Sequence, residues 1–209
     1  MYTPSAFAVS NSDALHDFVE ANSFATLVSA DESNVEASHL PLLLDRNSGA
    51  SGTLVGHMAK ANPQWENLDG REVLAIFHGP HAYISAGWYG EQNVVPTWNY
   101  VAVHARGILR IDNDRERLLD IVNRYVGFYE AQQVTPWPLE SADQQFVDKL
   151  LDAIVGFTVE LTQLEGKWKL NQNHSAERQQ RVVDGLRSQP DSGSQQIADL
   201  MQQNLAAEH

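Results

Sequence analysis

The chain has 209 residues, of which 43% are hydrophobic and 20% charged, and these proportions are typical of an ordered globular protein with one domain or one domain and an appendage. Its formal net charge of −13 disfavours nucleic-acid binding, because phosphate backbones attract positively charged surfaces. The absence of cysteine excludes disulfides, thiolate metal sites and cysteine nucleophiles. No apolar run approaches about 18 residues, and no basic segment precedes an apolar one at the N-terminus, so we expect neither a membrane span nor a secretion signal. The expected location is cytoplasmic.

The first half of the sequence alternates short β-branched and apolar runs with turn signals, a pattern typical of antiparallel strands. A short helix is predicted first, over residues 12–21, because residues that can cap a helix precede an apolar face. The strands of this half are predicted over residues 24–30, 35–45, 52–58, 72–78 and 82–85. Turns or single helical turns are predicted over residues 31–34, 46–49 and 62–68. Gly79-Pro80 is expected to end the fourth strand.

The second half begins with a loop over residues 87–96 and a long strand over 97–111, whose side chains alternate between two faces. Gly107 inside this strand predicts a bulge or a close approach of another backbone. The remaining elements are predicted as a helix of about sixteen residues capped by Asp112-Asn113-Asp114, a helix over 141–153, a strand over 155–164, a helix over 176–187, a linker over 191–194 and a polar, peripheral helix over 195–207.

Strands joined mostly by turns favour an antiparallel sheet that closes into a small barrel, so we predict a mainly β protein of six strands with peripheral helices, an α+β arrangement. No glycine-rich dinucleotide fingerprint follows a predicted strand, which disfavours a Rossmann fold. We expect one domain over residues 1–188, with helical insertions at about 112–153. Residues 189–209 are expected to form a linker and a peripheral helix.

Three polar and aromatic phrases lie close together in the middle of the chain. They are Gly56-His57-Met58-Ala59-Lys60-Ala61-Asn62-Pro63, Gly79-Pro80-His81-Ala82-Tyr83-Ile84 and Val95-Pro96-Thr97-Trp98-Asn99-Tyr100. Buried Trp and His side chains each need a hydrogen-bond partner, so a plain core has no need of such a cluster. A pocket for a flat ligand with polar edges would explain why these residues occur together.

With these phrases the chain resembles the PaiB family of FMN-binding split-barrel proteins, which belong to a larger group similar to pyridoxamine-phosphate oxidase. Further matches are Ser38-His39-Leu40-Pro41, Trp88-Tyr89 and Lys169-Leu170-Asn171-Gln172-Asn173. The resemblance extends from Met1 to about Leu186, and His174 departs from it, at a position where the family pattern leads us to expect Arg or Lys. It implies a six-stranded antiparallel split barrel, a homodimer with flavin sites at the subunit interface, and FMN as the cofactor. The family's usual description is a negative transcriptional regulator.

The candidate flavin contacts in the first half of the chain are Ser38, His39, His57, Lys60 and Asn62. Lys60 follows a strand and Asn62 precedes a helical turn, which suits phosphate binding but also suits a surface lysine and a helix-capping asparagine. The resemblance favours binding, with Lys60 at the flavin phosphate. Ser38 and His39 lie on opposite faces of a strand, so only one can face the barrel interior, and a core histidine is the alternative for His39.

The candidate contacts in the second half are Thr97, Trp98, Asn99, Lys169, Gln172 and Asn173. Trp98 can stack on the flavin ring or fill a dimer interface, where Trp is enriched. The lysine and the two amides can donate to a phosphate or a ribityl chain, or they can form a solvated loop that caps the next helix. No acid or base is distinguished from its neighbours, so no catalytic residue is assigned.

A cluster of histidines raises the alternative of a metal or haem ligand, because neutral imidazole binds both. They are His57, His78, His81 and His104. No helical pair of metal ligands is present, so we predict no metal site. Some split-barrel relatives bind haem, which makes haem the alternative cofactor, and a flavin-dependent oxidoreductase or a haem-binding or haem-degrading protein is the alternative function. Direct DNA recognition is not expected, since the chain is acidic and shows no basic recognition helix.

Overall fold

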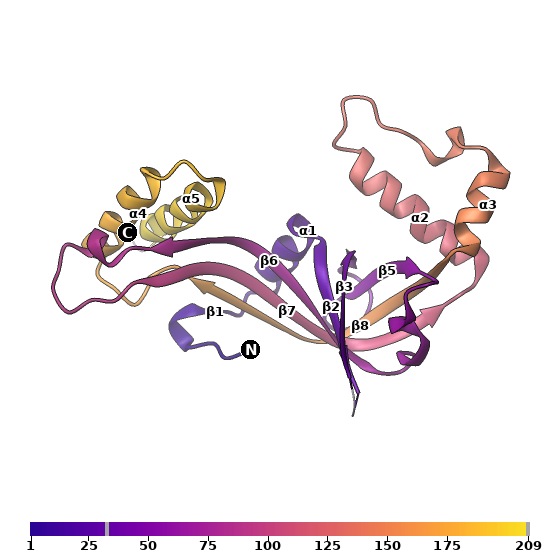
Figure 1. Ribbon diagram of the computed structural model, residues 1–209, viewed down its shortest axis with the longest axis horizontal. Helices are drawn as coiled ribbons and strands as arrows, with labels where there is room; N and C mark the ends of the chain where they lie inside the picture. Colours follow the sequence, from indigo (N-terminus) through magenta and orange to yellow (C-terminus); the bar gives the residue numbers. More distant parts are fainter. Residues whose placement is uncertain (32–33, 208–209) are drawn as a thin grey trace. The chain divides into compact units, whose positions relative to one another are not determined.

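The computed structural model describes residues 1–31 and 34–207, so the turn predicted over residues 31–34 lies partly outside it. The chain divides into two compact units. The terminal unit contains Met1–Phe18, His78–His104 and Glu165–His209, and the central unit contains Val19–Phe77 and Ala105–Leu164. The three longest strands each contribute residues to both units (Figure 1).

The protein is built on one open, mainly antiparallel sheet with eight strands in the described residues. They are β1 (Ala8–Val9), β2 (Phe24–Ala30), β3 (Val35–Pro41), β4 (Leu43–Asp45), β5 (Thr53–Ala59), β6 (Glu72–Ile84), β7 (Thr97–Asp112) and β8 (Ile154–Lys169). Their order is β3-β2-β6-β7-β8-β5-β4, and β1 pairs with β8. The mainly β, antiparallel prediction is confirmed, whereas the prediction of six strands in a closed sheet is wrong.

Five α-helices and four short 3₁₀ helices accompany the sheet in the described ranges. They are α1 (Ser12–Ala21), α2 (Arg115–Glu130), α3 (Gln144–Asp152), α4 (Ala176–Arg187) and α5 (Ser192–Ala207), with the 3₁₀ helices at Ser5–Phe7, Pro63–Asn67, Ala86–Tyr89 and Leu139–Ser141. The predicted cap of α2 is confirmed, because the Asp114 carboxylate accepts from the Arg117 amide at 3.1 Å. None of these helices is long and apolar enough to cross a bilayer.

The strand predicted over residues 35–45 is two strands, which changes the topology. β3 pairs with β2, whereas β4 pairs with β5. Pro41 has no amide hydrogen with which to continue the β3 ladder, and the next residue, Leu42, donates its amide to the Ser23 carbonyl at 2.8 Å. The two ends of the open sheet are therefore consecutive in the chain and joined through Leu42, which is fully buried.

The two strands predicted over residues 72–78 and 82–85 are one, because β6 runs without interruption through Gly79-Pro80. Gly79 does not form a turn; its lack of a side chain allows close packing against α1. A Cβ at this position would lie 2.8 Å from the Phe18 ring, so only glycine lets α1 approach the strand so closely. Likewise β8 continues to Lys169, beyond the predicted end at residue 164.

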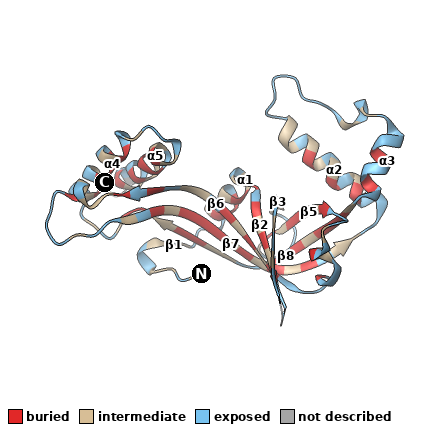
Figure 2. Ribbon diagram, in the orientation of Figure 1, coloured by how far each residue is buried: buried red, intermediate tan, exposed pale blue. Residues whose placement is uncertain are grey.

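Burial alternates along the long strands, as the sequence pattern of residues 97–111 predicts (Figure 2). In the central unit, α2 covers β4 and β5 with Ile121 and Tyr125, which pack on Leu43 and Val55. On its neighbouring face α2 contributes Leu118 to a second cluster with Val147 and Leu151 of α3. These clusters show why α2 and α3 are amphipathic, since each buries one apolar face.

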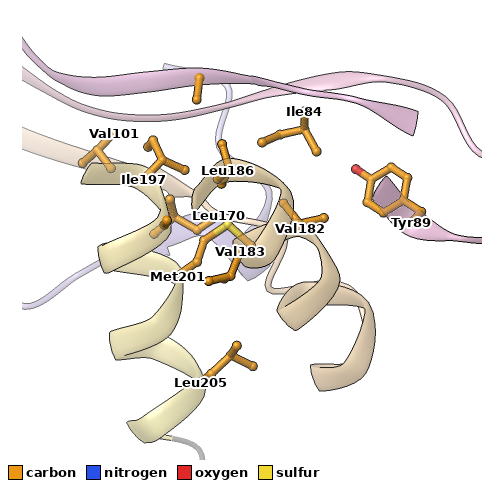
Figure 3. Close-up of a cluster of buried hydrophobic side chains, with 12 residues drawn as sticks. Ile84, Tyr89, Val101, Leu170, Val182, Val183, Leu186, Ile197, Met201 and Leu205 are labelled. Carbon is orange, nitrogen blue, oxygen red and sulfur yellow. The ribbon is translucent and has the colours of Figure 1, made fainter. Parts of the chain in front are cut away.

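The helix predicted to be polar and peripheral, α5, is part of the core of the terminal unit. It begins at Ser192, so it takes in most of the predicted linker, and Ile197, Ala198 and Met201 are fully buried. Figure 3 shows Ile197 and Met201 meeting side chains of α4 and of the strands; besides Ala198, the cluster also contains Ala82, Ile84, Tyr89, Val101, Leu170, Val182, Val183, Leu186 and Leu205. The many glutamines of α5 make its sequence polar on average, although its apolar residues recur at helical spacing and form one buried face. The domain boundary at residue 188 stays a prediction.

The close approach predicted at Gly107 is present in the central unit. A Cβ on Gly107 would lie 2.3 Å from the Glu160 carbonyl oxygen, and backbone cannot yield as a side chain can. We expect Gly107→Ala to lower the free energy of unfolding by about 1–3 kcal/mol, the usual cost of overpacking a core. Urea unfolding followed by circular dichroism measures this as a lower midpoint.

Gly127→Ala is the matched control, because a Cβ added at Gly127 in α2 would meet no neighbouring group within 4 Å. There we expect the midpoint to stay or rise, as alanine favours a helix by about 0.5–1 kcal/mol over glycine. Equal midpoints for Gly107→Ala and the parent protein would contradict the close approach.

Candidate functional site

The predicted site residues fall into two groups, one in each unit. The central unit holds Ser38, His39, His57, Lys60 and Asn62, and the terminal unit holds Thr97, Trp98, Asn99, Lys169, Gln172 and Asn173. In each group, some side chains make hydrogen bonds within the protein, and others have polar atoms that are available to a ligand.

Ser38 and Asn62 meet beyond the end of β5. Asn62 donates its side-chain amide to the Ser38 hydroxyl at 2.8 Å. The Asn62 side-chain oxygen accepts from the Gln64 amide at 3.0 Å, which caps the 3₁₀ helix over Pro63–Asn67 as the sequence predicts. Gln64 holds the neighbouring strands, since its amide group donates to the Leu27 carbonyl at 3.2 Å and to the Ser29 hydroxyl at 3.0 Å. The local backbone around Asn62 is thus well fixed.

Lys60 follows β5 directly, and its backbone is held on both sides. Its amide donates to the Ala153 carbonyl at 2.8 Å, and its carbonyl accepts from the Trp65 indole at 3.0 Å. The side chain is exposed, and no acceptor for its ammonium group is found within residues 1–31 and 34–207. A fixed backbone with an available cation is a good arrangement for binding an anion.

His57 is half-buried in β5, with its ring edge-on to the Tyr125 ring at a centroid distance of 4.9 Å. Burial lowers the pKa of His57, because it disfavours the charged form, so the imidazole is neutral at pH 7. Its Nδ1 atom is buried and has no hydrogen-bond partner among the described residues. Tyr125 donates its hydroxyl to the carbonyls of Pro41 and Val55, and burial raises its pKa strongly.

His39 is exposed on β3, so the alternative of a core histidine is wrong. It lies on the face opposite Ser38, as the alternation of a strand requires. Its Nδ1 atom lies 3.1 Å from the Thr26 hydroxyl, and its ring stacks on Phe24 at 6.4 Å. The cross-strand pairing of Thr26 with His39 explains the first contact, and Phe24 lies two residues before Thr26 on the same face of β2.

Lys169 in the terminal unit makes its hydrogen bonds within the protein. Its ammonium donates to the Thr97 hydroxyl and, at 2.6 Å, to the Trp98 carbonyl, which ties β8 to the start of β7. Burial and then the neighbouring charge of Lys167 lower the pKa of Lys169. Thr97 and Lys169 are thus brought together, and the hydrogen bond between them uses a donor of Lys169 that was expected to serve a ligand.

Gln172 and Asn99 are likewise occupied by contacts within the chain. Gln172 accepts from the Leu170 amide at 2.8 Å and donates to the Trp168 carbonyl at 2.6 Å, which closes the turn after β8. Asn99 is fully buried, with its amide 3.4 Å from the Met201 sulfur and its oxygen without a partner in the described residues. Asn173, by contrast, is exposed.

Trp98 belongs to an exposed ring cluster with His81 and Tyr83. The Trp98 side chain is 53% exposed and Tyr83 is 49% exposed. The Trp98 ring lies 5.8 Å from the Tyr83 ring and 6.1 Å from the His81 ring. The sequence predicts neither residue 81 nor residue 83 as a flavin contact, although His81 is among the histidines that raise the haem alternative; the strand is expected to end at Gly79-Pro80. Strand alternation through that point would have placed them on one outward face.

The basic residues of α4 are paired within the terminal unit. Arg178 and Arg181 both bind the Glu91 carboxylate, at 2.6 and 2.7 Å. Arg178 also lies over the Tyr89 ring and 2.9 Å from His174 Nδ1. Burial and the Arg178 charge lower the pKa of His174. Among the described residues no group of three or more His, Asp or Glu side chains could hold a metal ion.

The fold and sequence have known counterparts. A family model described as "Putative FMN-binding domain" matches residues 1–163. The "Protease synthase and sporulation protein PAI 2" of Bacillus subtilis (strain 168) is 34% identical over 209 residues, which cover 98% of each chain. An uncharacterized protein of Emericella nidulans is 28% identical over 243 residues, covering 97% of each chain.

Solved structures show the same fold at low identity. The FAD and heme binding protein from Mycobacterium smegmatis has a TM-score of 0.55 and 14% identity, covering 85% of this chain and 80% of that one. The flavocytochrome Anf3 from Azotobacter vinelandii has a TM-score of 0.55 and 11% identity, covering 78% and 69%. The shared fold is the split barrel, here with an open sheet. From the family match and the identity with PAI 2 over almost the whole length, the chain belongs to the FMN-binding-domain family and is of PaiB type.

Proposed function

We propose that the chain binds FMN as a homodimer in the cytoplasm and that it acts in regulation, as a PaiB-type protein. The observation that carries the proposal is the available donor set after β5 in a chain of the FMN-binding family. Lys60 presents a cation without a partner in the described residues, beside the hydrogen-bonded pair of Asn62 and Ser38.

The residues present fit the chemistry of FMN. Its phosphate needs a cation and hydrogen-bond donors, which Lys60, Ser38 and the second amide hydrogen of Asn62 supply. Separately from Lys60, the exposed ring cluster of the terminal unit offers flat aromatic surface of the kind on which a flavin ring can stack. Lys169 supports the strand that carries Trp98 and Gln172 supports the turn after β8, because their own polar atoms are already bonded.

Bound flavin supplies redox chemistry, while the protein binds and orients it. A flavin-dependent reaction is compatible with the site, and no acid or base of this chain is assigned to it. For regulation, protein contacts or a flavin-dependent state fit better than direct DNA recognition, because the net charge of −13 opposes a phosphate backbone.

Haem is the second candidate ligand, and one observation favours it. His57 is a neutral imidazole in a half-buried position, which is the form that ligates iron. One structural counterpart is described as binding both FAD and heme. Absorption distinguishes the two ligands, since haem gives a Soret band that flavin lacks.

Titration of the purified protein with FMN, followed by flavin fluorescence and absorption, tests the proposal. We expect saturable binding at one equivalent per chain. Lys60→Ala should weaken the affinity about tenfold or more, because a hydrogen bond to a charged group contributes about 1.5–3 kcal/mol.

Lys149→Ala is the control, since Lys149 is an exposed lysine of α3 outside both groups of candidate residues. The affinity of Lys149→Ala for FMN should match that of the parent protein. Unchanged affinity in Lys60→Ala removes Lys60 from the site, and a Soret band on adding haem without any response to FMN favours the second candidate.

The homodimer is supported by surfaces within each unit. The exposed ring cluster is of the composition found at protein interfaces, where Trp and Tyr are enriched. In the central unit, Phe24 and Val35 are 66% and 69% exposed on β2 and β3. Exposed apolar side chains on a sheet face are typical of a surface that a partner covers. The resemblance to PaiB proteins implies that flavin lies at such an interface.

Sedimentation at micromolar concentration measures the oligomeric state. We expect a dimer for the parent protein and a shift toward monomer for the double variant Tyr83→Ser with Trp98→Ser, because each side chain would lose apolar burial. Trp137→Ser is the control, as Trp137 is 45% exposed in the segment between α2 and α3. A monomeric parent protein, or a double variant as dimeric as the control, would contradict the proposal.

A further inference from the structure

The central unit has a cavity that the candidate flavin residues do not line. It has a volume of about 340 Å³ and lies against α2, β4 and residues 20–23. This volume is within the range of sites for small organic molecules. None of the residues proposed above to hold FMN contributes to its wall, so the cavity needs an explanation of its own.

The apolar part of the cavity wall is preformed. Leu42 is fully buried and Leu43 is 6% exposed, so neither can move far without disturbing the core. Leu43 belongs to the cluster with Ile121 and Tyr125, and Phe128 packs against that cluster. A wall already held by the core costs little ordering when a ligand binds, which favours affinity.

The rim of the cavity carries one uncompensated positive charge. Arg124 of α2 lines it, and no acceptor for its guanidinium is found in the described part of the chain. Glu20 also lines the cavity, but its carboxylate is held by Arg46 through two hydrogen bonds of 2.6 and 2.7 Å. Because Arg46 neutralises Glu20, the cavity presents Arg124 to a ligand, and an unpaired guanidinium favours a carboxylate in bidentate geometry.

A hydroxyl group adds a second polar contact at the same cavity. Ser23 lines it, and the Ser23 hydroxyl lies 2.7 Å from the Tyr129 hydroxyl. Two hydroxyls share a single hydrogen bond here, so when Tyr129 donates, the Ser23 hydrogen is left for another acceptor. A ligand carboxylate has two oxygens and can accept from both Arg124 and Ser23.

We propose that this cavity binds a small apolar molecule with a single carboxylate, such as a short fatty acid or an aryl-alkanoic acid. The carboxylate pairs with Arg124 and accepts from Ser23, and the hydrocarbon part lies on the half-buried side chains of Leu44 and Phe128. This proposal is independent of FMN binding, because it uses other residues, and it can be tested separately from the flavin site.

Calorimetric titration of the purified protein with octanoate and with 3-phenylpropanoate tests it, with octan-1-ol as the uncharged probe. We expect saturable binding of at least one acid with a dissociation constant below about 1 mM, which is modest for about ten heavy atoms. The alcohol should bind about tenfold more weakly, because it lacks the charge-assisted hydrogen bonds. Octanoate binding without 3-phenylpropanoate binding supports the proposal for an alkyl acid, and the reverse supports it for an aryl acid.

Two variants and one control locate the binding. Arg124→Gln should weaken acid binding at least tenfold and leave the alcohol unchanged. Leu44→Phe, which adds volume to the lining, should weaken both acid and alcohol. Arg117→Gln is the control on the same helix, because Arg117 is outside the lining and is paired with Asp112 at 2.7 Å. Circular dichroism and thermal unfolding confirm that each variant is folded.

Three outcomes would overturn the proposal. They are the absence of saturable binding by either acid, equal affinity for octanoate and octan-1-ol, and acid binding by Arg124→Gln that equals that of Arg117→Gln. Binding is measured without FMN, so a failure here says nothing about the flavin site, and a failed flavin titration leaves this result intact.

Discussion

The central unit depends on the single residue that joins the two ends of the open sheet. The Leu42 amide donates a hydrogen bond to the Ser23 carbonyl, and the Leu42 side chain is fully buried, so β3 can pass directly into β4. A Cβ on Gly56 would lie 2.7 Å from Leu42, which is why a glycine of β5 faces it. This join brings β3 beside the residues that follow β5, and the hydrogen bond from Asn62 to Ser38 exists because of it.

The candidate site is shaped by which polar groups the fold has already used. Lys169 and Gln172 are bonded to the backbone: Lys169 holds the strand that carries Trp98, and Gln172 holds the turn after β8. Lys60 has its backbone fixed and its ammonium available. Lys60 and Lys169 thus have different roles. The ammonium of Lys169 already donates hydrogen bonds within the protein, and a ligand would have to replace them, whereas the ammonium of Lys60 is available.

Local sequence signals predicted most of the elements and their caps. The helices at 12–21 and 176–187 and the capped helix after Asp114 are where the pattern placed them, because caps and apolar spacing act over a few residues. The joins between strands were predicted less well. Gly79-Pro80 is a strong turn signal in isolation, yet β6 passes through it, and the glycine instead leaves space for the Phe18 ring of α1.

The sequence by itself determined the family, the mainly β composition and the residue types of the candidate site, since these reside in short motifs and in periodicity. The tertiary structure decided the open order of eight strands, the burial of α5 and the availability of each donor in the described residues. Arg124 illustrates the difference. Its charge is evident from the sequence, but its availability to a ligand depends on Arg46 binding Glu20, a contact between residues 26 positions apart that only folding creates.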